Sequence, residues 1–169
     1  MKKYVAYGIG AALVDTEIKV EDEDLAQMNV DKGMMTLVDE ARQAQLLSHL
    51  QGHLVKASHA SGGSAGNSMI ATAQFGGPTF MSCKVAADRD GDIYVADLEA
   101  AGVDHGLNGS RAAGTTGKCL VLITPDAERS MNTFLGISET LSVEDVHAAA
   151  IAASEYLYIE GYLVTSATG

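Results

Sequence analysis

The sequence has 169 residues, of which 47% are hydrophobic, and its 22 acidic and 11 basic side chains give a net charge of -11 at pH 7. This length suits one domain with its own core, and the hydrophobic share is too high for a disordered chain. The negative charge opposes binding to nucleic acid, whose phosphates carry the same sign. We therefore expect one globular domain, or part of one, that does not bind nucleic acid.

The cysteine content and the hydropathy pattern indicate a cytoplasmic protein. Cys83 and Cys119 are the only cysteines, too few for a disulfide framework. The apolar stretches are interrupted well before the roughly 20 residues that a membrane span needs. Residues 1–10 are basic and then apolar, but Asp15 and Glu17 follow too soon for a signal peptide.

The first half of the chain predicts strands, one amphipathic helix and a glycine-rich loop that opens a second helix. These elements are, in order, strands over Tyr4–Ile9 and Leu13–Val20, a helix over Val38–Leu50, a strand over Leu54–Ser58, a loop over Ser61–Asn67 and a helix over Ser68–Phe75.

The second half begins with the same alternation and then departs from it. The patterns predict a buried strand over Thr79–Val85, a helix over Asp90–Ala101, an antiparallel hairpin of Lys118–Thr124 and Ser130–Leu135, a helix over Ser142–Ala152 and a buried strand over Tyr156–Ile159. The strand, loop and helix order indicates an α/β sheet, with the hairpin outside its parallel part. No helix is predicted after the last strand, so we expect the sheet to be only part of a larger one.

Two glycine motifs resemble nucleotide-binding loops only superficially. An extended segment follows Gly8-Ile9-Gly10, and Leu13 occupies the third glycine position of a dinucleotide fingerprint. Gly117-Lys118-Cys119 lacks the first glycine and the Ser or Thr of a P-loop, and a strand follows it. We expect neither loop to bind a nucleotide.

Two clusters of potential metal ligands also have simpler explanations. Four acids have the spacing of calcium ligands in an EF-hand, Asp88, Asp90, Asp92 and Glu99, but Ile93 occupies the glycine position. A solvated first helical turn explains them better. His49 and His53 are separated by the helix-ending Gly52, so we expect solvated histidines and no metal site.

The segment Gly62–Asn67 is the strongest candidate for a binding loop. Its glycines allow a ligand to approach the backbone, a helix that starts at Asn67 or Ser68 would direct free N–H groups toward that ligand, and Asn67 offers a donor and an acceptor. Asp15, on a strand edge, could accept protons from two hydroxyls of a polyol. The alternatives are a tight turn with an asparagine cap and a solvated Asp15.

Six segments together resemble the phosphofructokinase-B, or ribokinase-like, carbohydrate kinases, and within them the adenosine kinase branch. The resemblance extends over the whole chain and rests on residues 8–15, 62–68, 83–88, 101–104, 116–119 and 160–165. It implies the amino-terminal part of a three-layer α/β sheet, with a small β-sheet lid near residues 13–37 and 105–136.

The resemblance also implies roles for individual residues. Asp15 and Asn67 would hydrogen-bond the ribose hydroxyls, and the backbone of Gly62, Gly63 and Ser64 would line the same site. Met35, Cys119 and Tyr162 would line the part that receives the base. Arg129 would contact the transferring phosphate, where a cation stabilises the spreading charge.

Parts of the family pattern are missing from these residues. Cys83 and Ala86 replace glycines, and Leu163 replaces an aromatic residue of some adenosine kinases. The Gly-Ala-Gly-Asp motif, whose Asp is the family's general base, and the Asn-x-x-Glu motif do not occur. We therefore expect the substrate half of an enzyme that uses ATP and Mg²⁺, inactive alone, whose partner is a carboxy-terminal half or a second chain.

The expected activity is phosphorylation of a nucleoside 5′-hydroxyl, with adenosine and a role in purine salvage as the first choice. A sugar kinase or an inosine and guanosine kinase of the same family is the enzymatic alternative, and a small polar pocket instead of a purine-sized one would favour the sugar. The alternative from another class is a non-catalytic protein that binds a ligand or pairs through its lid strands.

Overall fold

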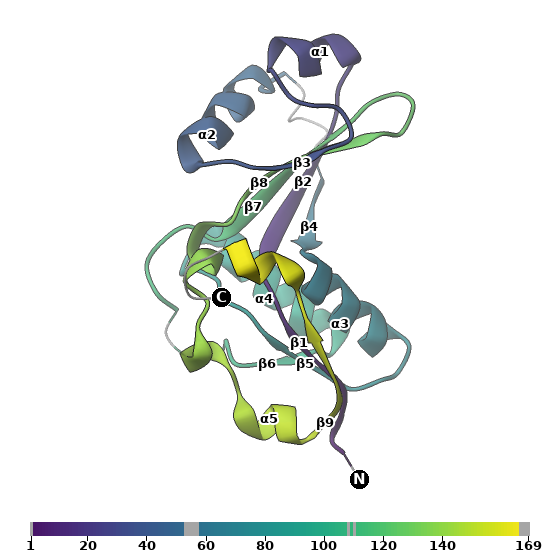
Figure 1. Ribbon diagram of the computed structural model, residues 1–169, viewed down its shortest axis with the longest axis vertical. Helices are drawn as coiled ribbons and strands as arrows, with labels where there is room; N and C mark the ends of the chain where they lie inside the picture. The colour runs from purple at the N-terminus through teal and green to yellow at the C-terminus, as the bar shows by residue number, and fades with distance from the viewer. Residues whose placement is uncertain (1, 53–57, 108, 110, 166–169) are drawn as a thin grey trace. The chain divides into compact units, whose positions relative to one another are not determined.

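The computed structural model describes residues 2–52, 58–107, 109 and 111–165. The chain forms two compact units, and each unit is assembled from segments that are distant in the sequence (Figure 1). The first unit combines Met1–Val14, Ser61–Gly117 and Leu135–Gly169, and the second combines Asp15–Ala60 and Lys118–Phe134.

The first unit is built on a four-stranded sheet with the order β6-β5-β1-β9, in which β1 runs parallel to β5 and β9, and β5 runs parallel to β6. Its strands are β1 (Tyr4–Ile9), β5 (Thr79–Ser82), β6 (Asp104–His105) and β9 (Ser154–Ile159). Parallel strands have their carboxyl ends at one edge of the sheet, which is where ligands bind in α/β folds. Gly10, Cys83 and Glu160 follow three of these strands and therefore lie at that edge.

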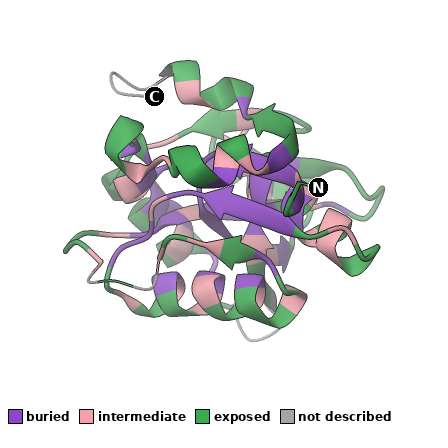
Figure 2. Ribbon diagram, turned by 90° about the horizontal axis from the view of Figure 1, so that it is seen from below, coloured by how far each residue is buried: buried purple, intermediate pink, exposed green. Residues whose placement is uncertain are grey.

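Helices cover both faces of this sheet, which gives three layers. Phe80 and Met81 are consecutive in β5, so their side chains point to opposite faces. Met81 packs with residues of α3 (Ser64–Gln74) and α4 (Arg89–Ala101), whereas Phe80 packs with Tyr7 and with Ala150 of α5 (Ala148–Ala152). Buried residues accordingly concentrate on the strands, and the helices keep exposed outer sides (Figure 2).

The second unit contains a five-stranded sheet with the order β3-β8-β7-β2-β4. Its strands are β2 (Leu13–Lys19), β3 (Met35–Leu37), β4 (Ser58–Gly62), β7 (Gly117–Ile123) and β8 (Arg129–Phe134). The predicted antiparallel hairpin is confirmed as β7 and β8, and β3 runs parallel to β8. Two helices, α1 (Asp22–Gln27) and α2 (Glu40–His49), pack on one face through a core that includes Ile18, Leu46 and Leu122.

The helix after the glycine-rich loop begins earlier than the sequence predicts. We expected it to start at Asn67 or Ser68, but α3 starts at Ser64, directly after Gly63. Gly63 has φ of 86° and ends the turn within one residue. Small residues then pack closely: a Cβ atom on Gly66 would lie 2.3 Å from the Tyr94 hydroxyl oxygen. The first turn of α3 therefore occupies the second half of the predicted loop.

The predicted helix over Ser142–Ala152 is wrong as one continuous element. A 3-10 turn, η3 (Val143–Asp145), is followed by an extended Val146 and then by α5. Tertiary hydrogen bonds explain the break, because the His147 N–H donates to the Tyr7 hydroxyl at 2.8 Å and the Ser82 hydroxyl donates to the Asp145 carbonyl at 2.9 Å. The capping box of Ser142 and Asp145 is confirmed.

The strand over Tyr156–Ile159 is present as β9, but the prediction that it is buried is wrong. Tyr156 is 68% exposed, Leu157 50% and Ile159 60%. Among the described residues β9 pairs only with β1, at the edge of the sheet. The next element is the 3-10 helix η4 (Gly161–Thr165).

Two predicted elements between residues 38 and 58 differ from the structure at their ends. Most of the predicted strand Leu54–Ser58 lies outside the described residues, whereas β4 begins at Ser58. The helix predicted from Val38 begins at Glu40, with Asp39 as its cap. A further 3-10 helix, η2, spans Gly136–Thr140. Among the described residues, no helix is long and apolar enough to cross a membrane.

Candidate functional site

The glycine-rich segment of the first unit is a tight connection between β4 and α3. Gly62 is the last residue of β4, and Gly63 turns the chain with φ of 86°. A Cβ atom on Gly63 would lie 2.5 Å from the carbonyl oxygen of Ala11, so only glycine fits this close approach. The connection is therefore packed against the segment that follows β1.

Asn67 presents its carboxamide from the first turns of α3. Its N–H donates to the Gly63 carbonyl at 3.0 Å, which places Asn67 inside the helix and not at its cap. Its side chain is exposed, and no hydrogen bond to that side chain is found within the described part of the chain. The carboxamide is thus available to donate to and accept from a ligand. Ser64, at the start of the helix, is exposed as well.

A buried carboxylate, Glu160, contacts Ala11, the residue against which Gly63 packs. It accepts a hydrogen bond from the Ala11 N–H at 2.9 Å and is only 4% exposed. Burial raises the pKa of Glu160, and hydrogen bonding from Ala11, Ser64 and Ala65 offsets part of that rise. Tyr162, two residues further along, is 50% exposed.

In the second unit, the predicted site residues Met35, Cys119 and Arg129 share one face of the five-stranded sheet. Successive side chains of a strand alternate between faces, and directly paired residues share a face. Met35 pairs with Met131, whose neighbours two positions away along β8 are Arg129 and Thr133. Thr133 in turn pairs with Cys119.

Asp15 lies close enough to Arg129 of this face for the two charges to interact. Burial raises the pKa of Asp15 to about 6, the positive charge of Arg129 lowers it, and the negative charge of Glu17 raises it further. The carboxylate of Asp15 has no hydrogen-bond donor among the residues described. It is therefore a partly desolvated charge that would gain from donors on a ligand.

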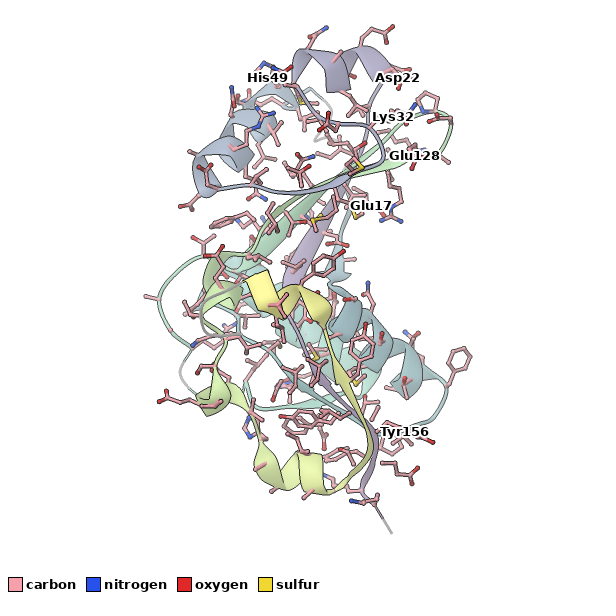
Figure 3. The ribbon with its side chains drawn as sticks, viewed as in Figure 1. Glu17, Asp22, Lys32, His49, Glu128 and Tyr156 are labelled. Atoms are coloured by element: carbon pink, nitrogen blue, oxygen red, sulfur yellow. The ribbon has the colours of Figure 1, made fainter. Side chains whose placement is uncertain are left out.

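Arg129 is already engaged by an acid in this structure. Its Nη2 donates to Oε1 of Glu17 at 3.1 Å, and both side chains are about half exposed. Glu17 is labelled in Figure 3, on the same strand as Asp15 and two residues after it. An exposed ion pair of this kind is weak, so an anionic ligand can compete for the guanidinium.

The two cysteines are not reactive groups. Burial raises the pKa of Cys83 to about 12 and that of Cys119 to about 11, so both thiols remain protonated. Neither forms a disulfide. Cys119 receives a hydrogen bond from the Thr133 hydroxyl at 3.3 Å, so it acts here as a small packing residue of the sheet face.

The two glycine motifs that resemble nucleotide-binding loops, and Asp88 of the acidic cluster, have structural roles. Gly8-Ile9-Gly10 leads into the strand β2, and Gly117-Lys118-Cys119 begins the strand β7, so neither opens a helix as a nucleotide-binding loop does. Asp88 caps α4 through the Gly91 N–H at 2.8 Å and accepts the Thr116 N–H at 2.9 Å.

No metal site is found in the described residues, where no group of three or more His, Cys, Asp or Glu side chains could hold an ion. His49 is in α2, and its predicted companion His53 lies outside the described residues. His59, on β4, forms a hydrogen bond with the Thr16 hydroxyl at 3.0 Å.

Comparison with known proteins identifies the family. Residues 29–168 match the model of the pfkB family carbohydrate kinases. The chain belongs to this family, and its α/β architecture is the ribokinase-like fold of its structural relatives. A search among curated proteins found no match.

Solved structures of kinases resemble the chain over almost its whole length. A probable sugar kinase from Rhizobium etli is 36% identical with a TM-score of 0.92, over 99% of this chain and 50% of that one. The adenosine kinase from Sinorhizobium meliloti is 36% identical with a TM-score of 0.90, over 98% of this chain and 50% of that one. The adenosine kinase of Anopheles gambiae shares the fold at 21% identity, with a TM-score of 0.83, over 96% of this chain and 52% of that one. The chain therefore spans about half the length of these relatives.

Sequence reasoning assigned no role to Glu17 or Glu160. The spacing of Glu17 from Asp15 was a usable signal, since residues two apart on a strand share a face. Glu160 follows an apolar strand directly, at the end where ligands bind in parallel sheets. Its burial could not be read from the sequence, because its hydrogen-bond donors come from segments far away in the chain.

Proposed function

We propose that these residues form the substrate-binding part of an ATP-dependent kinase that phosphorylates the 5′-hydroxyl of a nucleoside, with adenosine as the first candidate. The observation that carries the proposal is the state of Asp15, a partly desolvated carboxylate without a donor among the described residues. Two vicinal hydroxyls would supply the donors that this carboxylate lacks. The free carboxamide of Asn67 suits the same hydroxyls.

Arg129 is proposed to contact the phosphoryl group during transfer. Its charge is most useful when negative charge spreads over the transferring oxygens, so Arg129→Ala should reduce turnover more than substrate affinity. The exposed ion pair with Glu17 would have to open for this contact. Met35, Cys119 and Tyr162 are proposed to line the region that receives the base.

The second unit is proposed to act as a lid. A small sheet that closes over the substrate would exclude water, which would otherwise accept the phosphoryl group. ATP would be the phosphoryl donor. Mg²⁺ would accompany it, although no group of three or more potential metal ligands occurs among the described residues.

A sugar kinase is the second candidate, because a protein described as a probable sugar kinase is as similar to this chain as an adenosine kinase is. Asp15 and Asn67 would bind the hydroxyls of ribose in the same way as those of a nucleoside. The difference would come from the base, which only the nucleoside brings to Met35 and Tyr162.

The experiment is a substrate panel with the complete protein. Adenosine, inosine, guanosine and ribose are each incubated with ATP and Mg²⁺, and the phosphorylated products are quantified by ³¹P NMR. The proposal predicts AMP as the main product. Ribose phosphate in place of AMP would favour the sugar kinase, and binding of adenosine without transfer would favour a non-catalytic protein.

A further inference from the structure

Glu160 is a buried acid of the first unit that none of the proposed substrate contacts uses. It follows β9 directly, and its N–H donates to the Ile9 carbonyl at 2.9 Å. The main chain of Glu160 is thereby fixed beside the end of β1. Glu160 is only 4% exposed and is therefore buried from solvent.

The hydrogen-bond donors to this carboxylate come from two other segments. Its Oε2 accepts from the Ala11 N–H, at 2.9 Å, in the turn after β1. The Ser64 hydroxyl and the Ala65 N–H, in the first turn of α3, also favour the charged form of this carboxylate and lower its pKa. The first N–H groups of a helix have no partner within the helix, so a nearby carboxylate can accept hydrogen bonds from them. The positive end of the helix dipole also stabilises its negative charge.

Gly10, which precedes Ala11, leaves room for the Glu160 carboxylate because it has no side chain. A Cβ atom on Gly10 would lie 2.1 Å from Oε2 of Glu160 and 2.5 Å from the Cβ of Ala65. Three chain segments therefore meet at one carboxylate with no space for a larger residue. A buried carboxylate is costly unless it is well hydrogen-bonded, and breaking such a set leaves unsatisfied donors.

We infer that Glu160 is a positioning residue, which holds the turn Gly10–Ala11 against the first turn of α3 and so fixes the helix that presents Asn67. The part of this inference that concerns substrate rests on the proposed function. The part that concerns the position of the turn and the helix does not. Glu160 is not assigned a contact with substrate, because it is 4% exposed and its Oε2 already accepts the Ala11 N–H.

The test compares Glu160→Gln and Glu160→Ala in the full chain with Glu155→Gln, an exposed glutamate of the same strand. Amide hydrogen exchange at Ala11 and Ala65 is measured first, without substrate, together with thermal unfolding. The inference predicts exchange about 10-fold faster or more in Glu160→Gln, because a nitrogen donor would then oppose one of the N–H groups. Glu160→Ala should show a larger effect, and Glu155→Gln none.

Kinetics then test the connection to substrate. KM for adenosine should rise about 10-fold in Glu160→Gln, with kcat less affected, since a displaced Asn67 weakens binding first. Unchanged exchange at Ala11 and Ala65 would overturn the inference, and a raised KM in that case would indicate direct contact with substrate. If the wild type phosphorylates neither adenosine nor ribose, the proposed function fails, while the exchange experiment still decides the positioning role.

Discussion

Arg129 donates a hydrogen bond to Glu17 at 3.1 Å, and these two side chains act in opposite directions on the pKa of Asp15. Arg129 lowers that pKa and Glu17 raises it, while burial makes the largest contribution and brings it to about 6. The three charges therefore form one electrostatic set on a single face of the sheet, and changing any member should alter the titration of Asp15.

The first prediction concerns the pH dependence of kcat/KM for adenosine. The ionised form of Asp15 is the form that accepts hydroxyl protons, so kcat/KM should fall as the pH decreases through about 6. Glu17→Gln removes a negative neighbour and should move this acid limb to lower pH. Arg129→Gln removes the positive neighbour and should move it to higher pH. Identical limbs in both variants and the wild type would show that Asp15 does not control the profile.

The second prediction concerns stability and follows from the same shift. The pKa of Asp15 in the folded protein is above the ordinary value of an aspartate, so the folded state binds the proton more tightly than the unfolded state. The contribution of Asp15 to stability is therefore present below the unfolded pKa and lost as the pH rises through about 6.

Asp15→Asn should accordingly raise Tm relative to the wild type above pH 6, and the difference should diminish toward pH 4. Thermal unfolding of both proteins across this range measures it. The exposed Asp31, changed to Asn, is the control and should show no such pH dependence. A difference in Tm that is constant across the range would contradict the assigned shift.

The third prediction separates two effects at glycines with positive φ. Gly63 and Gly76 have φ of 86° and 88°, but a Cβ atom would meet the Ala11 carbonyl oxygen at 2.5 Å only at Gly63, while nothing lies within 4 Å at Gly76. Gly76→Ala should cost about 1 to 2 kcal/mol of unfolding free energy through backbone strain alone. Gly63→Ala should cost clearly more, as measured by denaturant unfolding. Equal losses would show that the turn can relax around the added methyl group.

The fourth prediction concerns a polypeptide limited to residues 1–169. We expect it to associate or aggregate, because β9 presents an edge with exposed apolar side chains, including Tyr156 (Figure 3). We also expect no transfer to adenosine, because the Gly-Ala-Gly-Asp motif of the family does not occur in these residues. Light scattering and a product assay test both points. A cooperatively folded monomer that makes AMP would contradict them.

The elements with strong local signals were predictable from the sequence. The hairpin of β7 and β8 has two β-rich runs on either side of a turn-rich link, and α4 has a cap at Asp88 and an αL glycine at its end. Tertiary contacts decided the elements that were predicted wrongly. Hydrogen bonds to Tyr7 and Ser82 interrupt the helix predicted over Ser142–Ala152, and no local pattern reports such contacts.

The site could be predicted only as a set of residues. That Met35, Cys119 and Arg129 share one face depends on the register of β3, β7 and β8, which distant pairings fix. The elevated pKa of Asp15 depends on its burial in the folded chain, and the positive charge that opposes this rise comes from Arg129, which is distant in the sequence. Short elements such as β3 and α1 were missed, since runs of three and six residues carry little periodicity.

The central claim is that Asp15 binds the hydroxyls of a nucleoside that is phosphorylated, and kcat/KM of Asp15→Ala for adenosine in the complete protein tests it most directly. Loss of two charge-assisted hydrogen bonds should cost about 2 to 4 kcal/mol of transition-state stabilisation, or roughly 30-fold to 1,000-fold in kcat/KM. KM should rise and kcat should fall, because the 5′-hydroxyl is no longer held in position. A kcat/KM equal to that of the wild type on both adenosine and ribose would remove Asp15 from the site and contradict the account.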